Sequence, residues 1–135
     1  MTVVVISGLP GAGKSSTARA LAARLAPSAH IEADVLHAML GDARVFPADG
    51  ARPDASSEAA RQLDLRLRQA CLLARDHVAA GHTAIVDDIV IADRLDEVRR
   101  HLAGLDVHLV MLDAPFERVR ARWLAMGSPF VDAWD

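Results

Sequence analysis

Short, continuously apolar runs alternate along this chain with stretches in which apolar residues recur every three or four positions. Runs of the first kind are typical of strands that are buried on both faces, as in a parallel sheet. The second spacing is typical of helices that bury one face. Strands are therefore expected at residues 2–7, 29–33, 83–91 and 107–112, and helices at residues 14–26, 35–40, 58–80, 94–103 and 115–126. This alternation predicts an α/β fold, a parallel sheet with flanking helices and right-handed crossovers.

Residues 41–57 interrupt the alternation with Gly, Pro, Asp and Ser at the density of a loop. A structureless segment of this length is unusual in a compact domain and is often a lid or a binding loop. We therefore assign residues 41–57 to a substrate-side loop.

The composition is that of a small globular domain. The chain has 135 residues, of which 52% are hydrophobic and 24% charged, and its formal net charge is −3. This balance shows no electrostatic footprint for duplex nucleic acid, and no apolar run reaches the ~18 residues that span a membrane. The single cysteine, Cys71, excludes an internal disulfide and a cysteine-based zinc site. We expect one cytoplasmic domain over residues 1–135, with no nucleic-acid or membrane partner.

Lys14 is the one lysine among 15 basic residues. It lies in GLPGAGKS, residues 8–15, which matches the P-loop pattern between an expected strand and an expected helix. Glycines let successive backbone N–H groups turn towards phosphate oxygens, and the following helix adds partial positive charge at its N-terminus. Lys14 is expected to act in catalysis by reaching the β- and γ-phosphates, and the Ser15 hydroxyl to ligate Mg²⁺. The alternative is a glycine-rich turn that binds nothing. The predicted nucleotide-binding residues are Gly8, Leu9, Pro10, Gly11, Ala12, Gly13, Lys14, Ser15 and Ser16.

Two adjacent carboxylates, Asp87 and Asp88, interrupt the third expected strand. Burying them without a cation or hydrogen-bond donors is costly, so they either serve a cation or lie past the strand end in solvent. Because side chains alternate along a strand, one of the pair is expected to face the P-loop and the other to face elsewhere. We predict that Asp87 is the second Mg²⁺ ligand, beside Ser15.

Four segments, GLPGAGKSS, EADVLHAML, AIVDDIV and VHLVMLDAPFERVRAR, together resemble the chloramphenicol phosphotransferase-like family of small P-loop kinases. The resemblance covers nearly the whole chain and keeps the order of the motifs. The P-loop is shared with many unrelated proteins, whereas the second and third segments are more discriminating. The resemblance implies a nucleotide-kinase-like P-loop fold, ATP and Mg²⁺ as cofactors, and transfer of the γ-phosphoryl group of ATP to a substrate hydroxyl.

The resemblance also implies that Asp34, which follows the second expected strand, is the catalytic base. A kinase needs a carboxylate beside the attacking hydroxyl, and the end of a strand that neighbours the P-loop strand is a suitable place for it. The alternative is that Asp34 caps the short helix that follows. His37 lies one turn further on and is given no role, because a single histidine on a short helix is more often a surface or packing residue.

The last expected helix becomes, by the same resemblance, part of an arginine-bearing lid at residues 115–127. Arg118, Arg120 and Arg122 lie on it, and steps of two place neighbouring arginines on different faces of a helix. We predict that Arg120 stabilises charge on the transferring phosphoryl group, with a solvated helix face as the alternative. Residues 123–127 are apolar, which departs from the family's usual lid.

The family continues past the lid into a fifth strand and a closing helix, whereas four strands are expected here. We therefore expect a fold that lacks its last strand and helix, as in a C-terminally truncated domain. An open, apolar sheet edge at residues 107–112 would recruit another strand, which predicts self-association through this edge.

These observations favour an ATP- and Mg²⁺-dependent O-phosphotransferase that acts on a small hydroxyl-bearing molecule, with antibiotics among the candidate substrates. One alternative is a kinase of a nucleic-acid 5′-hydroxyl or a nucleotide sugar. Phosphorylated acceptors of that kind favour a basic groove, yet residues 41–57 hold two arginines against three aspartates. The other alternative is a nucleotide-binding module without turnover.

Overall fold

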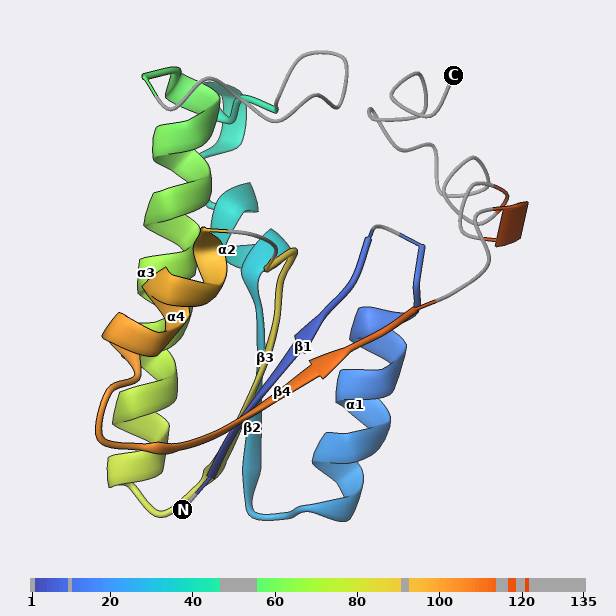
Figure 1. Ribbon diagram of the computed structural model, residues 1–135, viewed down its shortest axis with the longest axis vertical. Coiled ribbons are helices and arrows are strands. Elements are labelled where there is room, and N and C mark those ends of the chain that lie inside the picture. Colours follow the sequence, from blue (N-terminus) through green and yellow to red (C-terminus); the bar gives the residue numbers. More distant parts are fainter. Residues whose placement is uncertain are drawn as a thin grey trace.

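A single parallel sheet organises the chain. The computed structural model describes residues 2–9, 11–46, 56–90, 93–113, 117–118 and 121. Within these ranges the strands are β1 (Thr2–Ser7), β2 (Ser28–Glu32), β3 (Thr83–Asp87) and β4 (Asp106–Met111). They pair in parallel in the order β2-β3-β1-β4 (Figure 1). The α/β fold with a parallel sheet, expected from the sequence, is confirmed.

Helices cover both faces of this sheet. Helix α1 (Lys14–Arg24) packs on one face, and α3 (Glu58–Ala79) packs on the other with α4 (Arg94–His101) beside it (Figure 1). The short helix α2 (Ala33–Ala38) follows β2 directly and packs against α3, and a 3₁₀ turn, η1 (Gly41–Ala43), comes after it. The layers are thus helix, sheet and helix, as the alternating pattern predicts.

Alternation along β1 divides the core into two clusters. Val3 and Val5 pack with residues of α3 and α4, whereas Val4 and Ile6 pack with α1. Both faces of β1 are therefore apolar and buried, which is the physical reason why this strand is a continuous apolar run in the sequence.

Helix α3 carries most of the larger cluster. Leu67, Ala70 and Ala74 are buried at the spacing that the sequence predicts. Gln62 and Arg66 are buried on the same helix. The buried face of α3 therefore carries polar side chains in the N-terminal half of the helix, close to the ends of β2 and β3. The sequence analysis did not predict these buried polar residues.

Helix α2 buries only part of its apolar residues. Leu36 packs against the core, whereas Val35 and Met39 are exposed. Ala33 and His37 are buried. The helix begins at Ala33, directly after β2. Because residues four positions apart lie on the same face of a helix, Ala33 and His37 both point inward. His37 is therefore an interior side chain.

The strand order corrects one premise about the site. Asp34 was expected after a strand that neighbours the P-loop strand β1, but β3 lies between β2 and β1. The chain crosses from β1 through α1 to β2, and α3 then returns it to the gap between those two strands. The two carboxylates at the end of β3 therefore stand between the P-loop and Asp34.

Strand β4 forms one edge of the sheet. In the described part of the chain it pairs with β1 alone, and Leu109, Val110 and Met111 are exposed on it. No described helix is long and apolar enough to cross a membrane. Pro10, Arg120, residues 47–55 of the substrate-side loop and nearly all of the lid segment 115–127 lie outside the described residues.

Candidate functional site

The loop between β1 and α1 has the backbone of a phosphate cradle. Gly13, directly before α1, has a φ of 94°, a left-handed conformation that favours glycine. A Cβ atom at Gly8 would come within 3.1 Å of the carbonyl oxygen of Leu112, so a larger residue there would require the segment after β4 to shift by a few tenths of an ångström. Local geometry therefore favours glycine at both positions of the motif. That geometry leaves the first N–H groups of α1 without helical partners, the arrangement that binds anions.

Lys14 is folded into this loop. Its side chain is 9% exposed, and its Nζ atom donates a hydrogen bond of 3.2 Å to the carbonyl oxygen of Leu9. Burial lowers the pKa of Lys14, while Asp34, Asp87 and Asp88 act in the opposite direction. The charges of three carboxylates thus act on the ammonium group, although none of them forms an ion pair with it. A phosphate oxygen would provide the direct anionic partner.

Ser15 and Asp87 face each other across the gap between α1 and β3. The Oγ atom of Ser15 donates a long hydrogen bond of 3.4 Å to Oδ1 of Asp87. Burial raises the pKa of Asp87, and a hydrogen bond from the Nε2 atom of His30 to its Oδ2 atom opposes that rise. Two oxygen donors at this separation suit Mg²⁺, which prefers oxygen ligands at ~2.1 Å. The pair therefore fits the cation that a P-loop site requires.

A nitrogen donor also lies at this position. One ligand atom each from His30, Glu32 and Asp87 lies within 4.8 Å of the others, a grouping that could hold a metal ion. His30 and Glu32 alternate with the buried Ile31 along β2, so both lie on the sheet face that α1 covers. Neither residue was predicted from the sequence, because nothing in the local pattern of β2 shows that it pairs with β3.

Asp88 faces away from Asp87, towards α3. Its Oδ1 atom accepts hydrogen bonds from Nη2 of Arg66 at 2.5 Å and from the backbone N–H of Ile89 at 2.7 Å. Burial raises the pKa of Asp88, and Arg66 acts against that rise. The alternation predicted for the two carboxylates is thus observed. The alternative that both lie in solvent is wrong, because both are buried.

Asp34 lies at the rim of the site. It occupies the first turn of α2, where Glu32 holds the N-cap position, so the alternative role as a helix cap is wrong. Its side chain is 75% exposed, and Oδ1 accepts a hydrogen bond of 3.0 Å from Nη1 of Arg66. One oxygen of this exposed carboxylate is thus held by Arg66, and the other remains accessible from solvent.

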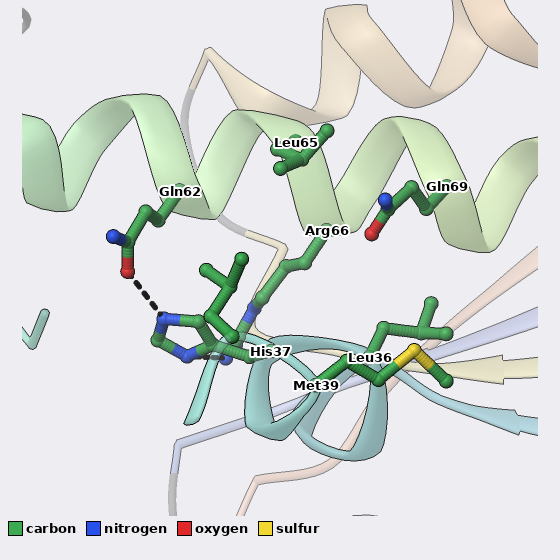
Figure 2. Close-up of a pocket in the computed structure, with 8 residues that line it drawn as sticks. Leu36, His37, Met39, Gln62, Leu65, Arg66 and Gln69 are labelled. Carbon is green, nitrogen blue, oxygen red and sulfur yellow. Dashed lines mark hydrogen bonds between the residues drawn. The ribbon is translucent and has the colours of Figure 1, made fainter. Parts of the chain in front are cut away.

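A small pocket lies between α2 and α3 (Figure 2). It measures about 50 Å³ and is lined by Leu36, His37, Met39, Leu40, Gln62, Leu65, Arg66 and Gln69. Figure 2 shows the His37 ring pointing towards Gln62, where its Nε2 atom lies 3.0 Å from the amide Oε1. The same Oε1 atom accepts a hydrogen bond of 2.7 Å from the backbone N–H of Val45. The pocket is thus joined to the first described residues of the substrate-side loop.

The structure brings together Lys14, Ser15 and Asp87, which the sequence predicts as site residues. Asp34 lies nearby and is linked through Arg66 to Asp88, the residue that follows Asp87. Ser16 is exposed on the first turn of α1. The sequence analysis did not identify Arg66 or Gln62. One signal was available for them: both fall on the inward stripe of a long amphipathic helix, where a charged or amide side chain needs a buried partner.

Comparisons with known proteins agree with this geometry. A family model described as chloramphenicol phosphotransferase-like protein matches residues 1–129. The APS kinase of Mycobacterium tuberculosis, solved in complex with AMPPNP and APS, is 26% identical with a TM-score of 0.71; the match covers 94% of this chain and 72% of that chain. No curated protein matches the chain.

Two further solved structures share the fold. A gluconokinase from Sinorhizobium meliloti 1021 is 19% identical with a TM-score of 0.60, over 98% of this chain and 70% of that chain. A sugar kinase from Janibacter sp. HTCC2649 is 23% identical with a TM-score of 0.61, over 91% of this chain and 65% of that chain. The P-loop kinase fold expected from the sequence is thereby confirmed.

Proposed function

The chain belongs to the chloramphenicol phosphotransferase-like family of P-loop kinases, and we propose that it transfers the γ-phosphoryl group of ATP to a hydroxyl group of a small molecule. One observation carries this proposal. A lysine, a serine and an aspartate, the residue types that a phosphoryl-transfer site needs, lie together where β1 and β3 end: Lys14, Ser15 and Asp87. The solvent-exposed carboxylate of Asp34 lies near this group.

Nucleotide binding is assigned to the P-loop. Backbone N–H groups of residues 11–16 and the Nζ atom of Lys14 would hold the phosphates, for which the left-handed Gly13 sets the shape of the loop. The AMPPNP-bound APS kinase, which shares this fold, supports ATP as the nucleotide. Ser15 and Asp87 would hold Mg²⁺, which neutralises charge on the phosphates when it is bound.

Asp34 is assigned to the acceptor. Its free carboxylate oxygen would orient the acceptor hydroxyl and take up its proton, while the hydroxyl oxygen bonds to the γ-phosphorus and the bond between that phosphorus and the β–γ bridging oxygen breaks. The products are the phosphorylated acceptor and ADP. Arg120, in the lid segment, would stabilise the charge that develops on the transferring group.

The acceptor is proposed to be small and largely uncharged. The pocket between α2 and α3 is lined by three leucines, a methionine, His37, two glutamines and Arg66, whose charge is paired with Asp34 and Asp88. Such a lining suits an apolar edge of the acceptor, because about 50 Å³ is too small for a whole drug-sized molecule. Chloramphenicol, named in the family description, is the first acceptor to test, and other antibiotics with free hydroxyls follow.

The test is a transfer assay with γ-labelled ATP and Mg²⁺. Chloramphenicol, gluconate, APS and an oligonucleotide with a free 5′-hydroxyl are offered in parallel, and a labelled small-molecule product is the expected result. Asp34→Asn should lower turnover by ~10²-fold or more, the usual contribution of a positioned base, with little change in ATP affinity.

Asp64→Asn is a matched control. Asp64 is also an exposed carboxylate, and it accepts a hydrogen bond of 3.0 Å from an arginine, Arg94 at the start of α4. Its turnover should equal that of the wild type. Labelling of the oligonucleotide alone would replace the proposed acceptor class. ATP binding without transfer to any acceptor would make the chain a nucleotide-binding module.

A further inference from the structure

Among the described residues, Arg66 is the side chain that contacts both Asp34 and Asp88. Its Nη1 atom donates to Oδ1 of Asp34 at 3.0 Å and its Nη2 atom to Oδ1 of Asp88 at 2.5 Å. A planar guanidinium offers its donors in a fixed fork, so the position of one carboxylate constrains the other. The two carboxylates come from different elements, the start of α2 and the end of β3.

The two carboxylates bound by this fork differ in burial and in their number of contacts. Arg66 is 6% exposed, and Asp88 is buried and also held by the N–H of Ile89. Asp34 is 75% exposed and lies on a helix of six residues. Among the described residues, its carboxylate forms a hydrogen bond or ion pair with Arg66 alone. The buried end therefore serves as an anchor, and the exposed end is what it orients.

A buried ion pair is a weak source of stability. Removing charges from water costs several kcal/mol per ion, and well-packed apolar replacements are often neutral or stabilising. In the described part of the chain, Nε of Arg66 and Oδ2 of Asp88 are the buried side-chain atoms that lack a hydrogen-bond partner. Such incompletely satisfied groups in a folded protein call for an explanation beyond stability.

We propose that Arg66 is a positioning residue: anchored by Asp88, it holds the carboxylate of Asp34 in the orientation that meets the acceptor hydroxyl. The inference rests on the proposed function of Asp34. In this proposal, Asp88 holds the guanidinium of Arg66, and Arg66 holds the carboxylate of Asp34. The orientation of the base on the short α2 is thus set by a residue of the long helix α3.

The same network reaches the substrate-side loop. Nη1 of Arg66 lies 3.4 Å from Nδ1 of His37, whose Nε2 pairs with Gln62. Gln62 in turn accepts from the N–H of Val45 and donates to the carbonyl oxygen of Ala43 at 2.8 Å. Gln62 thus fixes the start of the loop, whereas Arg66 fixes the base. Substitutions at the two positions should therefore affect different kinetic constants.

The experiment measures kcat, the KM of the acceptor and the affinity for ATP. The acceptor used is chloramphenicol, or gluconate or APS where the wild type phosphorylates that one. Arg66→Gln should lower kcat by ~10²-fold, the usual effect of a reacting group displaced by about 1 Å, and leave ATP affinity within about twofold. Arg66→Lys should lower kcat less than Arg66→Gln does, because it keeps the positive charge. Its kcat should still be below that of the wild type, because an ammonium group cannot bind both carboxylates at once. Gln62→Leu should mainly raise the KM of the acceptor.

Two further variants separate positioning from folding. Arg66→Gln leaves Asp88 buried without its cation, so the double variant Arg66→Met with Asp88→Asn removes both charges together. It should fold and bind ATP, and its kcat should stay as low as that of Arg66→Gln. Arg75→Met is the control on the same helix, because Arg75 donates to the carbonyl oxygens of His101 and Ala103, away from the site. It should lower thermal stability and keep kcat.

The outcomes distinguish the two proposals. Recovery of kcat in the double variant, or a kcat within a few-fold of wild type in Arg66→Gln, overturns the positioning role of Arg66 and leaves the proposed function standing. No transfer by the wild type to any of the three acceptors overturns the proposed function and the inference with it. A low kcat in the double variant with unchanged ATP affinity supports both.

Discussion

The Oγ atom of Ser15 lies 3.4 Å from Oδ1 of Asp87, although 71 residues separate the two along the chain. Ser15 belongs to the first turn of α1, and Asp87 is the last residue of β3. The register of the sheet sets this distance, because Ile6 at the end of β1 stands opposite Asp87. Parallel strands that end together thus bring the phosphate loop and an acidic side chain to the same edge of the sheet.

Asp87→Asn should selectively weaken the binding of ATP in the presence of Mg²⁺. The amide keeps the shape of the side chain but removes the negative charge that would face the cation. Isothermal titration of ATP, with Mg²⁺ and with EDTA, should show a loss of roughly tenfold or more with Mg²⁺ and a much smaller one without it. A tenfold loss corresponds to about 1.4 kcal/mol, close to the lower end of the ~1.5–3 kcal/mol that hydrogen bonds to charged groups contribute.

Asp96→Asn on α4 is the control for this variant, since Asp96 is an exposed carboxylate that pairs with Arg99. Its ATP affinity should be that of the wild type under both conditions. An equal loss with and without Mg²⁺ in Asp87→Asn would remove the cation role from Asp87.

Lys14→Ala should lower ATP affinity by roughly 10- to 100-fold, because a charge-assisted hydrogen bond contributes about 1.5–3 kcal/mol. Lys14→Arg should also fail to support transfer, because the buried site accommodates a compact ammonium and not a planar fork. Titration of ATP into each variant measures the first effect, and the transfer assay measures the second. Arg19→Ala, on the exposed side of α1, should behave as the wild type. Undiminished ATP affinity in Lys14→Ala would disprove the phosphate-binding role of this loop.

We expect the free energy of unfolding to decrease at acidic pH because of His37. Burial lowers its pKa, and the nearby Arg66 acts in the same direction. The neutral ring fits this site, since Nε2–H can donate to Gln62 while Nδ1 accepts from Arg66. With a folded-state pKa below the ordinary value of 6.5, the unfolded chain binds more protons as the pH falls through that value, so stability decreases towards acid.

Urea unfolding at pH 7.5 and pH 5.5 tests this prediction. The wild type should lose more stability between the two values than His37→Gln, which has no group that titrates there. His101→Gln, at the end of α4, is the control and should follow the wild type. Equal losses in the wild type and His37→Gln would mean that His37 can charge in the folded state without cost.

The exposed edge strand β4 should mediate self-association. Leu109, Val110 and Met111 expose apolar side chains next to unpaired backbone groups in the described part of the sheet, a combination that recruits further strands. Val110→Lys should reduce the self-association, because a charge on an edge strand opposes pairing. Sedimentation velocity across a range of protein concentrations measures it, with Leu72→Lys on the exposed face of α3 as the control. A wild type that stays monomeric at all concentrations would show that this edge is protected.

The sequence by itself predicted the strands and helices that the structure describes, and the glycine-rich turn that precedes α1. Strands buried on both faces are continuous apolar runs, and the glycines around Lys14 mark a turn that few other residues can adopt. The alternation of side chains along a strand also predicted that Asp87 and Asp88 would face opposite ways. These properties depend on neighbours within a few residues, so a single chain reveals them.

The tertiary structure decided which elements face each other. Periodicity shows that α3 buries one stripe, yet it does not show that Arg66 on this stripe meets Asp34 and Asp88, residues that lie 32 and 22 positions away along the chain. It does not show either that β3 inserts between β2 and β1, or that His37 rather than Val35 points inward from α2. A buried charge is stable only where partners from other elements reach it, and the packing of the whole sheet and its helices sets those distances.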